Sequence, residues 1–104
     1  MSAALEDVAA ECARQVAVEG FTPEHDDGHQ IGELAEAAAA YAANAAGLSG
    51  VVHQLWPWNC SWWKPKNFRY DLVRAAALLI KEIERFDRMA EKDTGGSKGK
   101  AITQ

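Results

Sequence analysis

Apolar side chains recur every three or four residues in three separate segments of the chain, the spacing that places them on one face of an α-helix. The segments predict helices over residues 3–19, from residue 28 or 29 to 46, and over 67–91. Gly20 and Gly47 directly follow the first two segments and are natural helix stops. The pattern therefore predicts an all-α fold, an antiparallel three-helix bundle, with a four-helix bundle as the alternative.

Each predicted helix has one apolar face that we expect to point into the core. The three faces consist of Leu5, Val8, Cys12 and Val16, then Ile31, Leu34, Ala38, Tyr41 and Ala45, then Phe68, Leu72, Ala76, Leu79, Ile83 and Phe86. Val73 and Ile80 widen the third face, which predicts that the last helix is buried on more than one side.

Two connecting segments separate the predicted helices. Residues 21–29, FTPEHDDGH, are predicted to be a loop because Pro23 and Gly28 punctuate them. Residues 48–67 contain four tryptophans and two prolines, with a short helical turn predicted at residues 51–55. Tryptophans at this density would be costly to leave in water, so we expect an ordered loop that folds back on the helices.

A chain of 104 residues is long enough for one modest core. We expect a single helical domain over residues 1–92 and a flexible tail over residues 93–104, which are rich in glycine and lysine. Hydrophobic residues make up 48% of the chain, but many of them are alanines, which bury little area. The helices therefore need close neighbours, and a homo-oligomer is expected.

Cysteine usage and hydropathy bear on the compartment. The two cysteines, Cys12 and Cys60, lack the CxxC spacing of a metal or redox motif, which favours a reducing environment. The N-terminus does not have the pattern of a signal peptide, and no stretch approaches the ~18 uninterrupted apolar residues that a membrane span needs. We expect an intracellular protein with no membrane partner.

Charge is distributed unevenly along the chain, whose formal net charge is −4. No lysine or arginine occurs between Arg14 and Lys64. The acids in this interval are Glu19, Glu24, Asp26, Asp27, Glu33 and Glu36. Because hard divalent cations bind several converging carboxylate oxygens, the interval predicts a site for Mg²⁺ or Mn²⁺. The alternative is an acidic, solvent-exposed helix face.

The predicted metal ligands come from two helices and the loop before them. His29, Glu33 and Glu36 are spaced i, i+4 and i+7, so they would share one helix face. Asp71 lies at the margin of the apolar face of the last helix, from which it could reach the same acids. The predicted ligand set is Asp26, His29, Glu33, Glu36 and Asp71. A zinc site built on His25 and His29 is the weaker alternative, since no cysteine is nearby in sequence.

Aromatic and basic residues alternate just before the last predicted helix. Aromatic rings stack on nucleobases, and lysine and arginine hold phosphates. The predicted ligand-binding residues are Trp62, Trp63, Lys64, Lys66 and Arg69. The alternative is that the tryptophans fill a core that alanine helices cannot fill alone.

Two long segments carry a resemblance to a known family. The strings EGFTPEHDDGH (residues 19–29) and WPWNCSWWKP (56–65) resemble a family of small proteins of tailed bacteriophages and prophages. That resemblance implies an accessory protein acting in the cytoplasm of the bacterial host.

A more distant resemblance is to the MazG-like all-α nucleoside triphosphate pyrophosphohydrolases, which carry ExxE on one helix and ExxD on a later one. Glu33-x-x-Glu36 matches the first pair, and Asp71 matches the second, with Phe68 where the other glutamate would stand. The resemblance implies Mg²⁺-dependent hydrolysis of a nucleoside triphosphate to monophosphate and pyrophosphate, with Glu33, Glu36 and Asp71 as catalytic residues.

Three functions remain open at this point. The first is nucleotide hydrolysis, which needs a complete carboxylate cage. The second is a non-catalytic sponge that sequesters a nucleotide or a nucleotide-derived signalling molecule, which needs only an aromatic and basic pocket. The third is binding of a host protein, which needs exposed tryptophans.

Overall fold

The structure, a computed structural model, describes residues 1–93, and every regular element in that range is helical. In chain order these elements are α1 (Ala3–Ala17), α2 (Pro23–Asp27), α3 (Glu33–Ala45), a 3₁₀ turn (Ser49–Val51), α4 (Val52–Leu55), a second 3₁₀ turn (Cys60–Trp62) and α5 (Phe68–Asp93). The predicted all-α class is therefore confirmed. Apart from Asp93, which ends α5, the predicted flexible tail lies outside the described residues.

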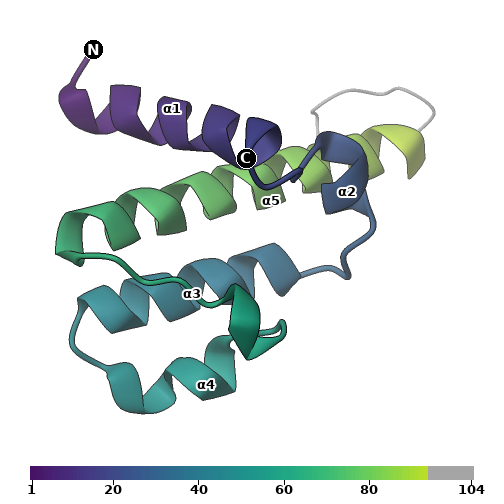
Figure 1. The fold of residues 1–104 in the computed structure, drawn as a ribbon. Coiled ribbons are helices and arrows are strands. Elements are labelled where there is room, and N and C mark those ends of the chain that lie inside the picture. Colours follow the sequence, from purple (N-terminus) through teal and green to yellow (C-terminus); the bar gives the residue numbers. More distant parts are fainter. Residues whose placement is uncertain (94–104) are drawn as a thin grey trace.

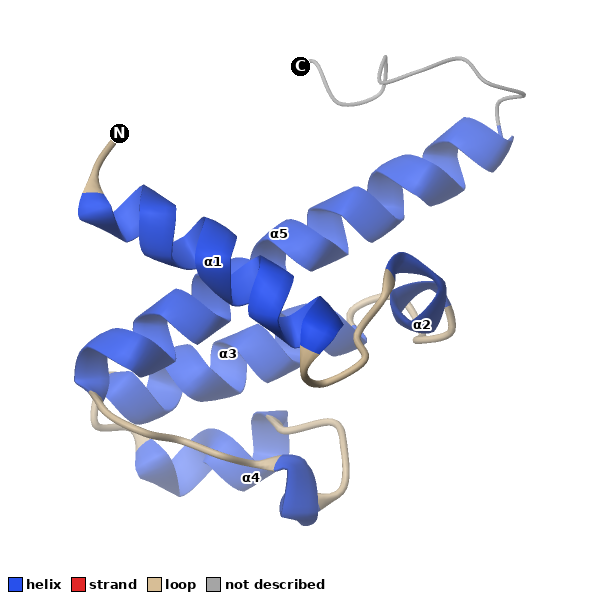
Figure 2. Ribbon diagram, turned by 45° about the horizontal axis from the view of Figure 1, so that its top comes forward, coloured by secondary structure: helices blue, strands red, loops and turns tan. Residues whose placement is uncertain are grey.

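The long helix α5 lies at the centre of the fold (Figure 1). It packs against α1 on one side and α3 on another, and α4 packs against α3. Helix α3 runs antiparallel to α5 (Figure 1), as expected. Helix α1 instead runs in the same general direction as α5 and crosses it obliquely (Figure 2), with Asp7 beside Arg69 and Cys12 beside Ala77. The sequence had suggested that all three main helices are antiparallel, but only α3 is antiparallel to α5.

The first and last helices have nearly the predicted bounds, but the segment between α1 and α3 differs. Thr22 caps a short helix, α2, where a loop was expected; its hydroxyl oxygen accepts a hydrogen bond from the His25 N–H at 3.1 Å. Helix α3 begins at Glu33 because Gly32, with φ of 93°, has a left-handed conformation that interrupts the helix. His29 therefore precedes α3 and is not part of it.

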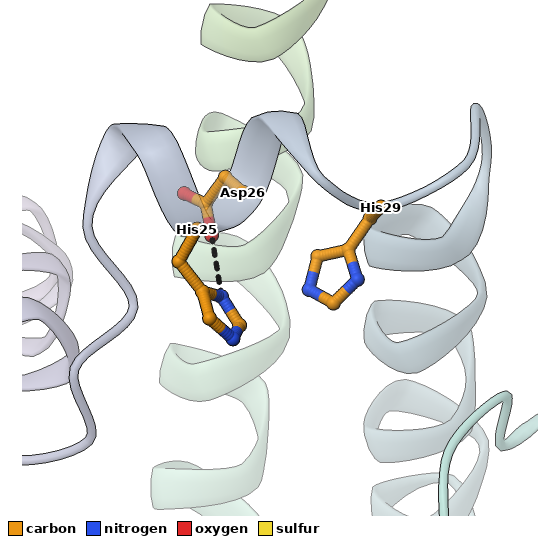
Figure 3. A group of neighbouring side chains, drawn as sticks. All are labelled: His25, Asp26 and His29. Atoms are coloured by element: carbon orange, nitrogen blue, oxygen red, sulfur yellow. Dashed lines mark ion pairs between the residues drawn. The ribbon is translucent and has the colours of Figure 1, made fainter.

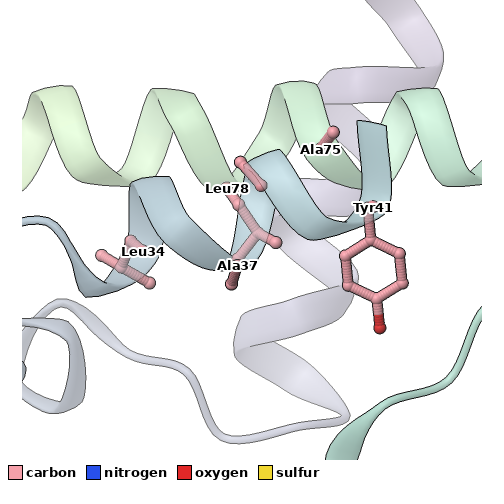
Figure 4. Close-up of a cluster of buried hydrophobic side chains, with 6 residues drawn as sticks. Leu34, Ala37, Tyr41, Ala75 and Leu78 are labelled. Atoms are coloured by element: carbon pink, nitrogen blue, oxygen red, sulfur yellow. The ribbon is translucent and has the colours of Figure 1, made fainter. Parts of the chain in front are cut away.

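A compact core forms where α3 packs against α5 (Figure 4). Its buried members are Leu34, Ala37, Ala38, Tyr41, Ala75 and Leu78. Alanines let the two helices approach closely. Trp56, Trp58 and Trp63 are partly buried and pack against this core. The expected ordered, folded-back tryptophan loop is thus observed.

The apolar face predicted for the last helix does not point into this core. Phe68, Leu72, Leu79, Ile83 and Phe86 are all exposed, by between 41% and 65%. The buried side of α5 instead includes charged residues, because their side chains hydrogen-bond to neighbouring elements, as described below. None of the described helices, α5 included, is long and apolar enough to cross a membrane.

Helix α1 is attached to α5 mainly through a buried polar network. The Glu11 carboxylate, only 3% exposed, accepts hydrogen bonds from Arg14 (two at 2.9 Å), Gln15 (2.9 Å) and the Tyr70 hydroxyl (2.7 Å), and Arg74 lies 3.6 Å away. Burial by itself would raise the pKa of Glu11, but these hydrogen bonds outweigh it and lower the pKa from 4.5 to about 2. Glu11 is therefore a strongly stabilised buried anion.

This network predicts acid sensitivity with a defined sign. Because the pKa of Glu11 is lower in the folded protein, its contribution to stability is complete above the unfolded-state value of 4.5 and is lost as the pH falls towards 2. The shift corresponds to about 3 kcal/mol. We expect Glu11→Gln to be less stable than the wild type at pH 7 in urea denaturation, and the difference to shrink steadily between pH 4.5 and 2. Glu6→Gln, at an exposed position of α1, is the control; an equal pH dependence in both variants would contradict the assignment.

Candidate ligand cleft and metal centre

Charged side chains from α5 hold α2 in place. Lys81 Nζ lies 2.7 Å from Asp26 Oδ2, and both residues are buried, with 4% and 3% of their surface exposed. Lys81 also donates to the Phe21 carbonyl at 2.8 Å. Arg85 donates to the backbone carbonyls of Asp26 and His29. The backbone on both sides of α2 is thus fixed by two buried cations that are remote in sequence.

A third cation completes the set of partners around α2. Two nitrogens of Arg88 donate to the Asp27 carboxylate: Nη2 lies 2.8 Å and Nε 3.1 Å from Oδ1. The hydrogen bond from Arg88 lowers the pKa of Asp27. The acidic interval therefore has counter-charges, although none is local in sequence. The absence of basic residues between Arg14 and Lys64 was the reason for expecting a cage of carboxylates around a metal. In the fold, basic residues of α5 supply the missing positive charges, so this reason no longer applies.

The residues around His29 are also tied to α3 and α5. The Gly32 N–H donates to Glu82 Oε2 at 3.0 Å, which holds the start of α3 against α5. Glu33 Oε1 lies 2.9 Å from His29 Nδ1 and accepts a hydrogen bond from Trp58 Nε1 at 3.2 Å. The Glu33 carboxylate therefore contacts both the His29 imidazole and the Trp58 indole.

An aromatic wall runs from α2 to the tryptophan loop. The Phe21 and His25 rings stack at 5.2 Å, the His25 and His29 rings meet edge to face at 5.0 Å, and the His29 and Trp58 rings stack at 4.9 Å. The Trp62 ring is tilted against the Phe21 ring, with the ring centres 6.4 Å apart. These rings enclose an open cavity of about 300 Å³, which we call the cleft; Glu19 and Asn59 complete its lining.

A narrow recess of about 30 Å³ adjoins the cleft and shares its Glu19, Phe21, Trp58 and Trp62 walls, with Glu19 paired to Arg14 at 3.2 Å. The cations that line it are Arg14, Lys64 and Arg74. Arg74 donates to the Tyr41 hydroxyl and to the Lys64 carbonyl, so its guanidinium is fixed in place. Lys64 is exposed, and its ammonium lies 5.7 Å from the centre of the Trp62 ring. A ring stacked on Trp62 would therefore have a mobile cation beside it.

Only part of the predicted ligand-binding set reaches the cleft. Trp62 lines the cleft with 49% of its surface exposed, and Lys64 lines the recess. Trp63 packs on Tyr41, with the ring centres 4.5 Å apart, and belongs to the edge of the core. Lys66 and Arg69 line neither cavity: Lys66 lies over the Tyr70 ring and Arg69 pairs with Asp7.

The predicted metal ligands are divided between two regions. Asp26, His29 and Glu33 lie together at the junction of α2 and α3, whereas Glu36 is exposed on α3. Asp71 accepts hydrogen bonds from the Asn44 side chain at 3.2 Å and from the Lys66 N–H at 2.8 Å. Asn44 lies eleven positions after Glu33 on α3, about 16 Å along the helix axis. The structure therefore does not bring Asp71 together with Glu33.

Several cleft residues were not predicted from the sequence. Phe21, Trp58 and Asn59 were not among the predicted ligand-binding residues, Glu19 was named only among the acids of the metal interval, and His25 was named only in the zinc alternative. The available signal was the spacing of His25 and His29, four positions apart with Asp26 between them. Such spacing often brings two imidazoles to one side of a helical turn.

The chain was compared with known proteins. No protein-family model, curated protein or solved structure matches it.

The Lys81–Asp26 pair predicts a large loss of stability when only one partner is removed. Lys81→Met leaves a buried carboxylate without its counter-charge, so we expect a loss of about 3–5 kcal/mol in the free energy of unfolding, measured in urea. The double variant Lys81→Met/Asp26→Asn should recover part of that loss, because no buried carboxylate is left without its counter-charge. Arg88→Ala, which breaks a half-exposed pair, should cost under about 1 kcal/mol. A Lys81→Met variant as stable as the wild type would show that the pair does not anchor α2.

Proposed function

We propose that the protein binds a nucleotide or a nucleotide-derived molecule in the cleft between α2 and the tryptophan loop. The observation that carries the proposal is the cavity of about 300 Å³ whose lining includes the rings of Phe21, Trp58 and Trp62. Its size is at the lower end for small-molecule sites, which suits one nucleobase with its sugar. Trp62 offers the more accessible ring for stacking.

The charges near the cleft match the remainder of such a ligand. Phosphate groups that leave the cleft towards the recess would meet Lys64, and beyond it the fixed guanidinium of Arg74. Lysine ammonium groups contact phosphates as mobile point charges. Mg²⁺ or Mn²⁺ would enter in this proposal with the phosphates of the ligand; Glu19 lines the cleft, and Glu33 contacts two of its lining residues, His29 and Trp58.

We propose binding without turnover, as in a sponge, in preference to hydrolysis. Metal-assisted phosphoryl chemistry needs its carboxylates around one ion or two adjacent ions. Glu33 is at the start of α3, whereas Asp71 of α5 contacts Asn44 near the other end of α3, so these two expected catalytic residues share no metal in this arrangement. Release of pyrophosphate from a bound triphosphate would revive the enzymatic alternative, with Glu33, Glu36 and Asp71 as the residues to test.

Binding of a host protein through the tryptophans has weaker support. That function needs several exposed rings, whereas Trp56, Trp58 and Trp63 pack against the core and only Trp62 of the four is exposed. One exposed tryptophan beside a cavity fits a ligand site better than a protein-binding surface.

The proposal makes a prediction for paired variants. Trp62→Ala should weaken nucleotide binding by about 1–3 kcal/mol through lost stacking, with little change in melting temperature because the ring is half exposed. Lys64→Ala should also weaken binding, and high salt should reproduce its effect on the wild type. The measurement is calorimetry with a panel of nucleoside triphosphates and cyclic dinucleotides, with and without Mg²⁺ or Mn²⁺.

Two residues outside the cleft provide matched controls. Lys66→Ala removes an exposed lysine of the same segment, and Phe68→Ala removes an exposed aromatic ring. Neither should change the affinity. If no member of the panel binds, or if Lys66→Ala weakens binding as much as Lys64→Ala, the cleft is not the nucleotide site.

We further propose that the chain forms the expected homo-oligomer through α5. Support comes from the exposed apolar face of this helix, where Phe68, Leu72, Leu79, Ile83 and Phe86 are spaced to share one side over five turns. Large contiguous apolar surfaces of this kind typically mark interaction sites. A second copy supplies the same face, so two α5 helices can cover each other symmetrically.

Self-association predicts a change in mass when this face is charged. We expect Leu79→Glu/Ile83→Lys to be a monomer in size-exclusion chromatography with light scattering, while the wild type is a dimer or larger. The helical content should stay unchanged, because both side chains are exposed in the single chain. The control is Glu84→Lys, an exposed position on another side of α5. A wild-type mass equal to one chain at micromolar concentration would refute the proposal.

A further inference from the structure

We propose that His25, Asp26 and His29 form a binding site for a divalent transition metal of the zinc class, held by the protein itself. The inference is independent of the proposed nucleotide, because it concerns binding of the metal alone. It also differs from a magnesium site built on carboxylates, since two of the three ligands are imidazoles.

The three side chains converge on one point at the edge of the cleft (Figure 3). A ring nitrogen from each histidine and a carboxylate oxygen of Asp26 all lie within 4.8 Å of one another. The nearest measured pair is His25 Nδ1 and Asp26 Oδ1, at 3.9 Å. Zinc sites with three protein ligands and one open position commonly use such a set of nitrogen and oxygen donors.

The Asp26 carboxylate offers an oxygen that nothing else uses. Its Oδ2 is paired with Lys81, but Oδ1 is buried, has no hydrogen-bond partner and faces His25. A buried carboxylate oxygen without a partner is costly in a folded protein. A metal ion between Oδ1 and the two imidazoles would satisfy it, while Lys81 would keep the carboxylate oriented through the other oxygen.

Glu33 prepares His29 to act as a ligand. Figure 3 shows one ring nitrogen of His29 facing His25 and the other facing α3. The nitrogen on the α3 side is Nδ1, which lies 2.9 Å from Glu33 Oε1. When Nδ1 carries the proton and donates it to a carboxylate, the lone pair of Nε2 is left free, which is how metal-binding histidines are usually held. Trp58 fixes Glu33 in turn through its indole N–H. Glu33 is therefore a positioning residue in this site and not a ligand.

Only a small movement is needed to close the site. A tetrahedral ion with bonds of about 2.0–2.2 Å holds its ligand atoms roughly 3.3 Å apart. The ligand atoms here are at most 4.8 Å apart, and the 46% exposed His25 side chain, whose ring contacts Phe21 and His29, would have to turn only slightly towards the other two. Asp26 and His29 are held by Lys81, Arg85 and Glu33, so the site has two fixed ligands and one adjustable ligand.

The local charge indicates what the open position of the metal would face. Asp26 and Glu33 contribute two negative charges, and the buried Lys81 and Arg85 contribute two positive charges. A divalent ion would therefore give the site a net positive charge. Because His25 and His29 also line the cleft, that charge would favour an anionic group of a bound molecule as the next ligand.

The decisive experiment is titration of the purified full chain with Co²⁺ and Zn²⁺, without nucleotide, read by calorimetry and by the visible absorption of Co²⁺. We expect one ion per chain, a tetrahedral Co²⁺ spectrum, displacement of Co²⁺ by Zn²⁺, and no displacement by excess Mg²⁺. His25→Gln should weaken binding at least tenfold without changing the melting temperature of the apoprotein, since this side chain is half exposed. Asp26→Asn is unsuitable as the first variant because it also breaks the Lys81 pair.

Two further variants separate the site from general affinity for metals. His53→Gln changes the third histidine, which is exposed on α4, and should bind Co²⁺ like the wild type. Glu33→Gln should still bind, but ~10–100-fold more weakly, because only the positioning of His29 is lost.

Several results would overturn the inference. These are the absence of stoichiometric Co²⁺ or Zn²⁺ binding, equal binding by His25→Gln and the wild type, or a thiolate charge-transfer band assigning the ion to Cys60. Displacement by Mg²⁺ would point to a carboxylate site instead. A bound metal with no nucleotide affinity would sustain this inference while refuting the proposed function.

Discussion

The organisation of the fold depends on the burial of Lys81 and Arg85 beneath α2. Burying a cation costs several kcal/mol unless its partners are in place, so these two side chains permit only one position for the segment from Phe21 to His29. That segment contributes Phe21, His25 and His29 to the cleft. The aromatic wall and the convergence of the His25, Asp26 and His29 side chains therefore depend on the contacts between α5 and a helix of only five residues.

The periodic pattern was sufficient to predict the all-α class and, except at the start of α3, the approximate extent of the main helices. Ser2 and Gly20 delimit α1, and Gly47 follows α3 almost as expected, because capping and left-handed glycines act locally. The start of α3 was wrong because a glycine inside the predicted helix, Gly32, takes a positive φ that no apolar periodicity reveals.

Hydrophobicity predicted the buried face of α3, where Leu34, Ala38 and Tyr41 join the core, but not the buried faces of α1 and α5. Glu11, Gln15, Lys81 and Arg85 are buried, while the most apolar side of α5 is exposed. The reason is that each buried polar group finds its partner on an element distant in sequence, as Glu11 finds Tyr70 and Asp26 finds Lys81. The same long-range pairing explains why an interval without basic residues suggested a cage of carboxylates. A spacing pattern can place His25 and His29 near each other, but only the fold places Glu33 behind one of them and Trp62 in the lining of the cleft.

The polar attachment of α1 has a consequence for the order in which the molecule opens. Among the described residues, no apolar side chain of α1 is fully buried, whereas α3 and α5 share a dry core of leucine, alanine and tyrosine. Elements held by few apolar contacts exchange their amide hydrogens through local opening, well before global unfolding. Amides of α1 should therefore exchange sooner than those of α3. Arg14, Gln15 and Glu19 line the recess, so each local opening of α1 would briefly expose the recess to solvent.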